Sequence, residues 1–302
     1  MNRLLALAAL LCLVPAAGAA SVRSVTAPAP VLALELDGGR IAYATGRSER
    51  DCDRVLVWNL ATRGVSKLGR KTHCEQTSTG NQIAAVSIAG TRVLWLHYVG
   101  GNTRDCTLWA ATTTKPTPVR LRFVSRDVDA AAPIVIGKGD DSRLGSLLPY
   151  AVDRVAVALR ADGSRAFTWT APARIVGLAA GDGQLAIASE GGVVSVLGAR
   201  GRVLRTERFG TEVDAVRITG DLLVVQRGRT LELRGGRTAI YSLIAGVKLA
   251  DADRDRAVLV GGGKVRTFDL NSGRGAVAAS GSFAGLEGAT LAVASGRIVS
   301  VR

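Results

Sequence analysis

The chain has 302 residues, of which 47% are hydrophobic, 21% charged and only 4% aromatic, with 36 glycines and 8 prolines. This composition excludes a disordered or collagen-like chain and leaves ample length for a large core. The formal net charge is +14, but two histidines and four cysteines leave little material for histidine-based or metal-based chemistry.

The first twenty residues have the composition of a secretory signal peptide. A positive charge at Arg3 precedes an apolar run over 4–14, which is followed by small residues up to Ala20. As a helix the run would rise only about 16 Å, too little for the roughly 30 Å core of a bilayer. We therefore expect residues 1–20 to be a signal peptide and residues 21–302 to be exported without a transmembrane segment. A retained anchor is the alternative.

A repeat runs through the rest of the chain. Seven segments follow turns rich in Gly or Asp, and each has one polar residue and then four or five apolar positions: Arg40–Ala44, Arg92–Leu96, Arg154–Ala158, Gln184–Ala188, Asp221–Val225, Arg256–Val260 and Thr290–Ala294. Unbroken apolar runs between turns are typical of strands buried on both faces. Each is followed by an alternating run, such as Val55–Leu60. No segment after the signal peptide has extended helical spacing, so we predict an all-β protein.

The length of the repeat predicts the architecture. About 280 residues over seven units give roughly 40 residues per unit, the length of a four-stranded propeller blade. The seventh unit ends at Arg302 without a fourth strand, whereas residues 21–26 form a strand-like segment without a blade. We predict one seven-bladed β-propeller over 21–302, with four-stranded antiparallel blades and the last blade closed by the N-terminal strand. A β-helix is the rival all-β fold.

Two turns carry a resemblance to known proteins: Val57-Trp58-Asn59-Leu60-Ala61-Thr62-Arg63-Gly64 and Thr267-Phe268-Asp269-Leu270-Asn271-Ser272-Gly273. With these turns the chain resembles exported β-propellers related to TolB-like and WD-repeat proteins, although the Gly-His and Trp-Asp pairs of the full WD repeat are missing from it. The resemblance implies a propeller over the whole mature chain. It implies no activity, because propellers serve many unrelated functions.

Insertions interrupt the repeat in its first half. Residues 46–53 and 97–105 lengthen hairpins between second and third strands, and residues 70–82 and 125–148 lengthen links between blades. Antiparallel strand order puts both kinds of connection on one face, so we expect the insertions to gather there over blades 1–3. Long loops in a compact domain are often functional, although they could merely cap the channel. The candidate contact residues are Arg47, Arg50, His73, Glu75, His97, Tyr98, Asn102 and Arg104.

Three cysteines remain after export, in a compartment that permits disulfides. Cys52 and Cys74 should lie near one outer edge of blade 1, and a bond between them would close about 23 residues and contribute roughly 3 kcal/mol of stability. We predict this pairing, with Cys106 left free. Three single pairings stay open from the sequence alone.

The sequence offers few catalytic or metal-binding patterns. His73, Cys74 and His97 lack metal-ligand spacing, so we expect no metal and no cofactor. The alternative function is a lyase or hydrolase of polysaccharide or lactone, with His73 or His97 at the channel mouth. Its carboxylates would come from the loop acids Asp127, Asp129, Asp140 and Asp141.

The partner is predicted from charge and aromatic content. The arginines are spread along the chain without a basic run of five, which argues against a nucleic-acid partner and favours anionic envelope polymers or phospholipid head groups.

Trp58, Trp109 and Trp169 could form a stacking platform, but we expect them to fill wedges between blades. We predict a monomeric, non-enzymatic binding module, secreted or in the cell envelope, with a protein or anionic polymer as its partner. A purely structural envelope component is a third class.

Overall fold

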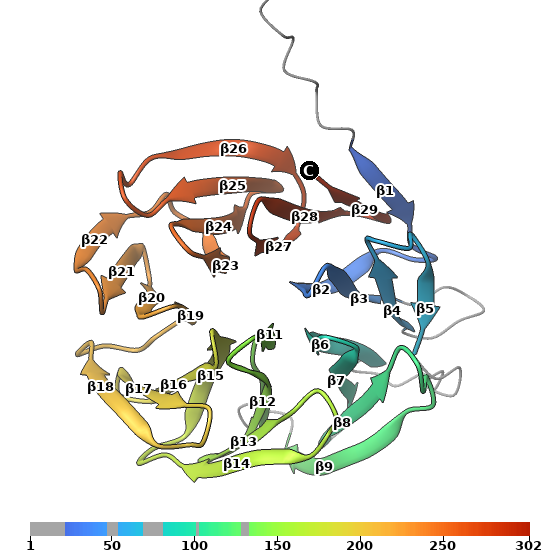
Figure 1. Ribbon diagram of the computed structural model, residues 1–302, viewed down its shortest axis with the longest axis horizontal. Coiled ribbons are helices and arrows are strands. Elements are labelled where there is room, and N and C mark those ends of the chain that lie inside the picture. The colour runs from blue at the N-terminus through green and yellow to red at the C-terminus, as the bar shows by residue number, and fades with distance from the viewer. Residues whose placement is uncertain (1–21, 47–53, 69–80, 101–102, 128–132) are drawn as a thin grey trace, which may run out of the picture.

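A computed structural model describes residues 22–46, 54–68, 81–100, 103–127 and 133–302. The strands form seven antiparallel sheets arranged around a central axis (Figure 1). The predicted all-β, seven-bladed propeller is therefore confirmed. The described residues contain no helix, and hence no helix long and apolar enough to cross a membrane.

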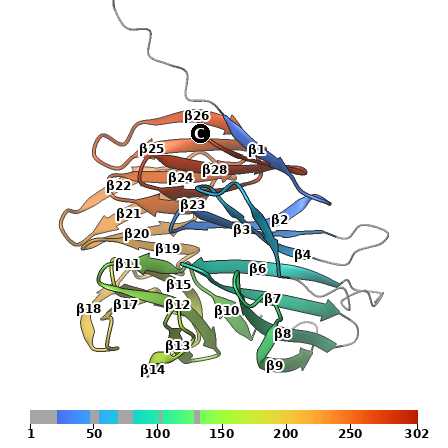
Figure 2. The same ribbon diagram turned by 45° about the vertical axis from the view of Figure 1, so that its right-hand side comes forward.

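In each blade the strands run from an inner strand beside the axis to an outer strand at the rim (Figures 1 and 2). Blade 1 comprises β2 (Val31–Asp37), β3 (Arg40–Thr45), β4 (Arg54–Asn59) and β5 (Val65–Lys67), and blade 2 comprises β6 (Asn81–Ala89), β7 (Arg92–Gly100), β8 (Thr103–Thr112) and β9 (Val119–Asp127). Blade 4 comprises β15 (Ile175–Gly181), β16 (Gln184–Ser189), β17 (Val193–Gly198) and β18 (Val203–Arg208).

Blades 5 to 7 have the same four strands, joined by shorter loops. Blade 5 comprises β19 (Ala215–Thr219), β20 (Leu222–Arg227), β21 (Thr230–Arg234) and β22 (Ala239–Ser242), and blade 6 comprises β23 (Lys248–Asp253), β24 (Arg256–Gly261), β25 (Lys264–Asp269) and β26 (Gly275–Ser280). Blade 7 comprises β27 (Phe283–Glu287), β28 (Thr290–Ser295), β29 (Ile298–Val301) and, at the rim, β1 (Arg23–Thr26).

Blade 3 departs from the predicted strand assignment. Its inner strand is split into β10 (Ile134–Ile136) and β11 (Asp140–Ser142), and both pair with β12 (Gly145–Val152), which is followed by β13 (Val155–Leu159) and β14 (Arg165–Thr170). The interpretation of residues 125–148 as an irregular link was therefore wrong, because three strands begin within it. The run beginning at Arg154 is the third strand rather than the second.

A proline explains why the second strand of blade 3 was missed. Pro149 lies inside β12, where a strand prediction based on unbroken apolar runs would not place it. The Gly137 amide donates to the Pro149 carbonyl (3.0 Å), so the proline nitrogen, which has no hydrogen, faces the break between β10 and β11. The split inner strand thus accommodates the missing donor.

The N-terminal strand closes the ring as predicted. β1 pairs antiparallel with β29, with Arg23 opposite Val301 and Thr26 opposite Ile298. The Ala27 amide extends this ladder by donating to the Arg297 carbonyl (2.7 Å). Figure 1 shows the C-terminus beside β1. The outer edge of β29, which would otherwise be unpaired, is therefore covered.

The core lies in the wedges between blades. It consists of seven hydrophobic clusters, and each joins residues of two neighbouring blades. Trp58, Trp109 and Trp169 all pack in these clusters, as the wedge interpretation predicts. Trp169 lies on the fourth strand of its blade, however, so the three side chains do not share one position.

The hairpin of blade 2 is a strand extension rather than a loop. β7 continues to Gly100 and β8 begins at Thr103, so most of the predicted 97–105 loop is paired. Tyr98 lies opposite Cys106, and both pack against the cluster between blades 2 and 3. Alternating apolar side chains continue the sheet and hold this arm in place.

Polar side chains near the ends of the inner strands link each blade to another. Their oxygens accept backbone amides from the turns between first and second strands: Asp37 from Gly90 (3.0 Å), Asp140 from Gly183 (3.3 Å), Asp182 from Gly220 (2.6 Å), Thr219 from Arg254 (2.7 Å), Asp253 from Gly288, and Glu287 from Gly38 (2.8 Å). No such acceptor comes from the described residues of blade 2, but Asp37 also accepts the Asp141 amide of blade 3 (3.1 Å). The links surround one mouth of the channel with carboxylates.

Candidate functional site

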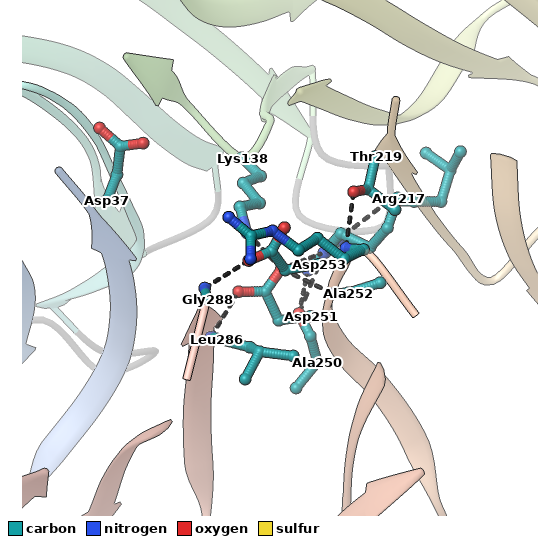
Figure 3. A network of polar contacts seen from close by, with 12 residues as sticks. Asp37, Lys138, Arg217, Thr219, Ala250, Asp251, Ala252, Asp253, Leu286 and Gly288 are labelled. Carbon is teal, nitrogen blue, oxygen red and sulfur yellow. Dashed lines mark hydrogen bonds and ion pairs between the residues drawn. The ribbon is translucent and has the colours of Figure 1, made fainter. Parts of the chain in front are cut away.

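A buried ion pair crosses the central channel (Figure 3). The Nζ atom of Lys138, in the break of the inner strand of blade 3, donates to Oδ1 of Asp251 on β23 of blade 6. The other carboxylate oxygen of Asp251 accepts the Leu286 amide of blade 7 (2.7 Å). Because the Asp251 side chain is only 2% exposed, its charge depends on these partners.

Arg217 on β19 approaches the same carboxylate from blade 5. Its Nε lies 3.7 Å from Asp251 Oδ1. Nε and one terminal nitrogen donate to the Ala250 carbonyl, and the other terminal nitrogen donates to the Val216 carbonyl (2.7 Å). Two cations therefore share one carboxylate inside the channel.

Glu35 on β2 completes the charged cluster, which we define as Glu35, Lys138, Arg217 and Asp251. Burial raises the pKa of Glu35 to about 8, although the Lys138 charge acts in the opposite direction. Burial alone would lower the pKa of Lys138, but the carboxyls of Asp251 and Glu35 outweigh it, and the pKa is raised. At neutral pH the cluster therefore holds two cations, one carboxylate and one mainly protonated acid.

The mouth on the side of the linked turns is narrow and acidic. Its cavity has a volume of about 80 Å³, and its carboxylates include Asp37, Asp182 and Glu287. Burial raises the pKa of Asp37 to about 7, against the hydrogen bonds from the Gly90 and Asp141 amides. Acids therefore outnumber the one lysine, Lys138, among the residues that line this mouth.

The opposite mouth opens into a larger cavity of about 600 Å³. Inner strands of blades 3 to 6 line it with Val135, Val176 and Val247 among the apolar residues, and Arg217 contributes to its surface. A cavity of this size is in the range that holds small organic ligands.

Arginines line the boundary between blades 2 and 3. We call Arg104, Arg122, Arg126 and Arg165 the arginine seam. Arg104 on β8 lies directly opposite Arg126 on β9. Its guanidinium stacks 5.3 Å from the Tyr98 ring, whereas Arg126 pairs with Asp153 at 2.7 Å.

Tyr150 connects the seam to blade 3. Burial raises the pKa of this tyrosine, while the positive charges of Arg122 on β9 and Arg165 on β14 act in the opposite direction, which places both near the ring. The two arginines are exposed. The seam therefore runs along the outer strands of two blades and presents several cations to solvent.

The structure brings together only some of the predicted contact residues. Tyr98 and Arg104 lie in contact on the blade 2 arm. His97 belongs to the same arm but is 4% exposed, and its Nε2 forms a 2.7 Å hydrogen bond with Asn81 Oδ1. The expectation that His97 is an exposed loop residue was wrong, because β7 continues through it and its side chain packs inward.

Other predicted residues lie outside the described part of the chain: Arg47, Arg50, Cys52, His73, Cys74, Glu75 and Asn102. The predicted disulfide between Cys52 and Cys74 therefore stays a prediction. Cys106 is a free thiol, 2% exposed, and burial raises its pKa.

Within the described residues the acids of the alternative enzymatic site are divided between two faces. Asp140 and Asp141 lie beside the turns around the acidic mouth: the Asp140 carboxylate accepts the Gly183 amide, and the Asp141 amide donates to Asp37. His97 lies toward the other end of the blades, in the last part of β7. The same residues contain no cluster of three His, Cys, Asp or Glu side chains suited to a metal ion.

The channel cluster was not predicted, although the sequence holds a signal for it. Glu35, Arg217 and Asp251 each stand between two apolar neighbours inside an inner strand, at Val31–Asp37, Ala215–Thr219 and Lys248–Asp253. The strand search used only the second strands of the repeat. A charge between apolar neighbours at the inner position of several units would have indicated a polar channel.

Comparisons with known proteins extend the fold assignment. No family model matches the chain, and no curated protein matches its sequence. Among solved structures, "Structure of U3-55K" is similar with a TM-score of 0.60 at 12% identity, over 93% of this chain and 97% of that one. "Crystal Structure of Mitotic Checkpoint Complex" contains a chain similar with a TM-score of 0.57 at 16% identity, over 99% and 98%. The crystal structure of Sqt1 of Saccharomyces cerevisiae is similar with a TM-score of 0.52 at 12% identity, over 92% of this chain and 97% of that one. The chain therefore shares the fold of WD-repeat-type propellers.

Proposed function

We propose that the chain is exported and acts as a binding module at the cell envelope or outside the cell, where the blade 2 and 3 part of its loop face holds an anionic polymer. One observation carries the choice of partner: Arg104 and Arg126 lie directly opposite each other in the β8–β9 ladder. Like charges in that position destabilise a sheet. Asp153 already pairs with Arg126, but that pair is exposed, and an anion between the two arginines would add an attraction to both.

The spacing of the seam favours a polymer over a single small anion. Arg122 and Arg126 are four residues apart on β9, which corresponds to about 13 Å along a strand. One phosphate or carboxylate contacts both only if the two side chains bend toward each other. A chain with repeated anionic groups can contact several arginines at once, and each added contact raises the total affinity.

Two further observations support the proposal. The segment at 1–20 has the three regions of a signal peptide, which supports export. One similar solved chain belongs to a structure described as a complex, which supports binding as the general role of the fold. An enzymatic role has less support, because Asp140 and Asp141 lie at the acidic mouth, whereas His97 lies toward the other end of the blades.

The polymer proposal is tested by binding of the purified chain to polyphosphate and dextran sulfate, with neutral dextran as the reference. The Arg104→Gln/Arg126→Gln variant should bind both polyanions at least about tenfold more weakly, since two charge-assisted contacts are lost. The matched control is Arg200→Gln/Arg202→Gln, because these two arginines are exposed on blade 4. Equal losses in the two variants would show attraction by net charge alone, without a seam.

The partner class and the location need separate measurements. Binding that requires a protein from the envelope fraction, with no affinity for either polyanion, would overturn the polymer proposal in favour of a protein partner. For location, the chain expressed with its own N-terminus should be recovered outside the cytoplasm and should begin near Ser21. A cytoplasmic chain that still carries Met1 would contradict export.

A further inference from the structure

The wide mouth of the channel has the features of a small-molecule site that is separate from the arginine seam. Its volume is about 600 Å³, and apolar residues from four blades line it together with the polar residues Asp214, Arg217, Gln226 and Lys248. Arg217 is the least exposed of its charged residues, with a side chain only 19% exposed. A pocket that combines apolar residues with a few placed polar groups is typical of sites for small organic ligands.

The guanidinium of Arg217 keeps donors for a ligand. A guanidinium has five N–H groups. Three of them are used by the carbonyls of Val216 and Ala250, and the remaining two have no partner among the described residues. The two belong to different terminal nitrogens, which is the arrangement that binds a carboxylate through both of its oxygens.

The charge balance of the channel favours an anion. Lys138 and Arg217 share the carboxylate of Asp251. The further acids near Lys138, such as Asp37 and Asp140, line the narrow acidic mouth and not the wide one. The charged residues that line the wide mouth are two cations, Arg217 and Lys248, and one acid, Asp214, so its lining carries a net positive charge.

We propose that the wide mouth binds a small organic acid, with its carboxylate on Arg217 and an apolar body against Val135, Val176 and Val247. The acid enters from this side because the opposite mouth is narrow and lined by carboxylates. Phosphate and other compact anions would leave the valines of the cavity uncovered, so an acid with an apolar body fits it better.

Phenylacetate and its neutral analogue phenylacetamide provide the test, by calorimetry with the purified chain at pH 7. The acid should bind at least about tenfold more tightly than the amide, since only the acid can form a charge-assisted pair. In Arg217→Gln this preference should disappear. Equal affinities in the unaltered chain, or an unchanged preference in Arg217→Gln, would overturn the proposal.

A second variant keeps the test decisive if Arg217→Gln fails to fold. Lys248→Glu changes an exposed residue at the rim, so it should fold, and it should weaken phenylacetate binding several-fold without changing phenylacetamide binding. Lys264→Glu, exposed on the same blade but outside the cavity, is the control and should change neither. Equal effects of the two substitutions would refute the site.

The seam and the cavity fail independently. Arg104→Gln/Arg126→Gln should bind phenylacetate normally, and Arg217→Gln should bind polyanions normally. An unaltered chain that binds phenylacetate but neither polyanion would reject only the seam, and one that binds both polyanions but not phenylacetate would reject only the cavity.

Discussion

Arg23 lies directly opposite Val301 in the β1–β29 ladder, so the two ends of the described chain form one edge of blade 7. Deleting residues 21–26 removes this strand and exposes the edge of β29. We expect a loss on the order of 3 kcal/mol, from ladder hydrogen bonds and the packing of Val25, and a fall in melting temperature of roughly 6–12 °C. Calorimetry of chains that begin at residue 21 and at residue 27 measures the difference. Identical melting would contradict closure.

The buried ion pair should contribute far more than a surface pair. Asp251→Asn leaves the ammonium of Lys138 buried without a counter-charge, and we expect a loss of about 3–5 kcal/mol. Asp153→Asn removes the partner of Arg126, but both side chains of that pair are more than 40% exposed, so the loss should stay below about 1 kcal/mol. Denaturant unfolding of both variants gives the comparison, and equal losses would be inconsistent with a buried charge cluster.

Glu35 should make stability depend on pH. Folding raises its pKa from 4.5 to about 8, so the stability that it contributes is complete below pH 4.5 and is lost as pH rises toward 8. The groups that act on it are Lys138, Asp251, Arg217 and Asp37.

In Glu35→Gln the side chain stays neutral at every pH, so this loss should vanish. Melting temperatures are measured between pH 4 and pH 9. The melting temperature of the variant, relative to that of the unaltered chain, should rise from about pH 4.5 and become constant above about pH 8. Asp37, with its own raised pKa, titrates in both chains, so pH dependence that the two chains share is assigned to Asp37 and only the difference between them to Glu35. Parallel curves would show that Glu35 is charged in the folded chain at neutral pH.

Blades 4 and 5 approach closely at Gly181. A Cβ atom there would lie 2.1 Å from the backbone oxygen of Ile218. Gly181→Ala should therefore force the inner strands apart and cost more than about 2 kcal/mol. At Gly198 the nearest contact of an added Cβ is a side-chain atom of Leu204 at 3.6 Å, so Gly198→Ala is a suitable control that should unfold like the original chain. A small effect at Gly181 would mean that the blades can separate locally.

The thiols report on both the predicted disulfide and the fold. Cys106 is buried, so Ellman's reagent should label it only after unfolding. If Cys52 and Cys74 are bonded, the exported chain, unfolded without reductant, should show one thiol. Peptide mapping without reduction should then recover the linked pair. Three thiols in the exported chain would exclude the disulfide.

The number of blades could be predicted because the second strands carry a strong signal. Segments such as Gln184–Ser189 are apolar on both faces and lie between turns, so their composition alone indicates strands buried in the middle of a sheet. In blade 3 the same criterion selected the third strand, since Pro149 interrupts the composition of the second without interrupting its pairing. Local composition does not reveal where a missing amide donor can be tolerated.

The candidate sites were harder to predict, because they depend on residues far apart in the chain. Lys138 and Asp251 are separated by 113 positions and meet only when the ring closes. Arg104 was expected at a loop face, but its position opposite Arg126 depends on the β8–β9 register, which a bulge between Leu108 and Trp109 shifts. His97 was misjudged because a polar residue beside an insertion resembles a loop residue, whereas Asn81 gives it a buried partner.

The pairing of β1 with β29 also sets an order for assembly. During synthesis β1 appears long before its partner β29, so blades 1 to 6 can form in order while blade 7 is still incomplete. We therefore expect the contacts between blades 7 and 1 to be the last to form.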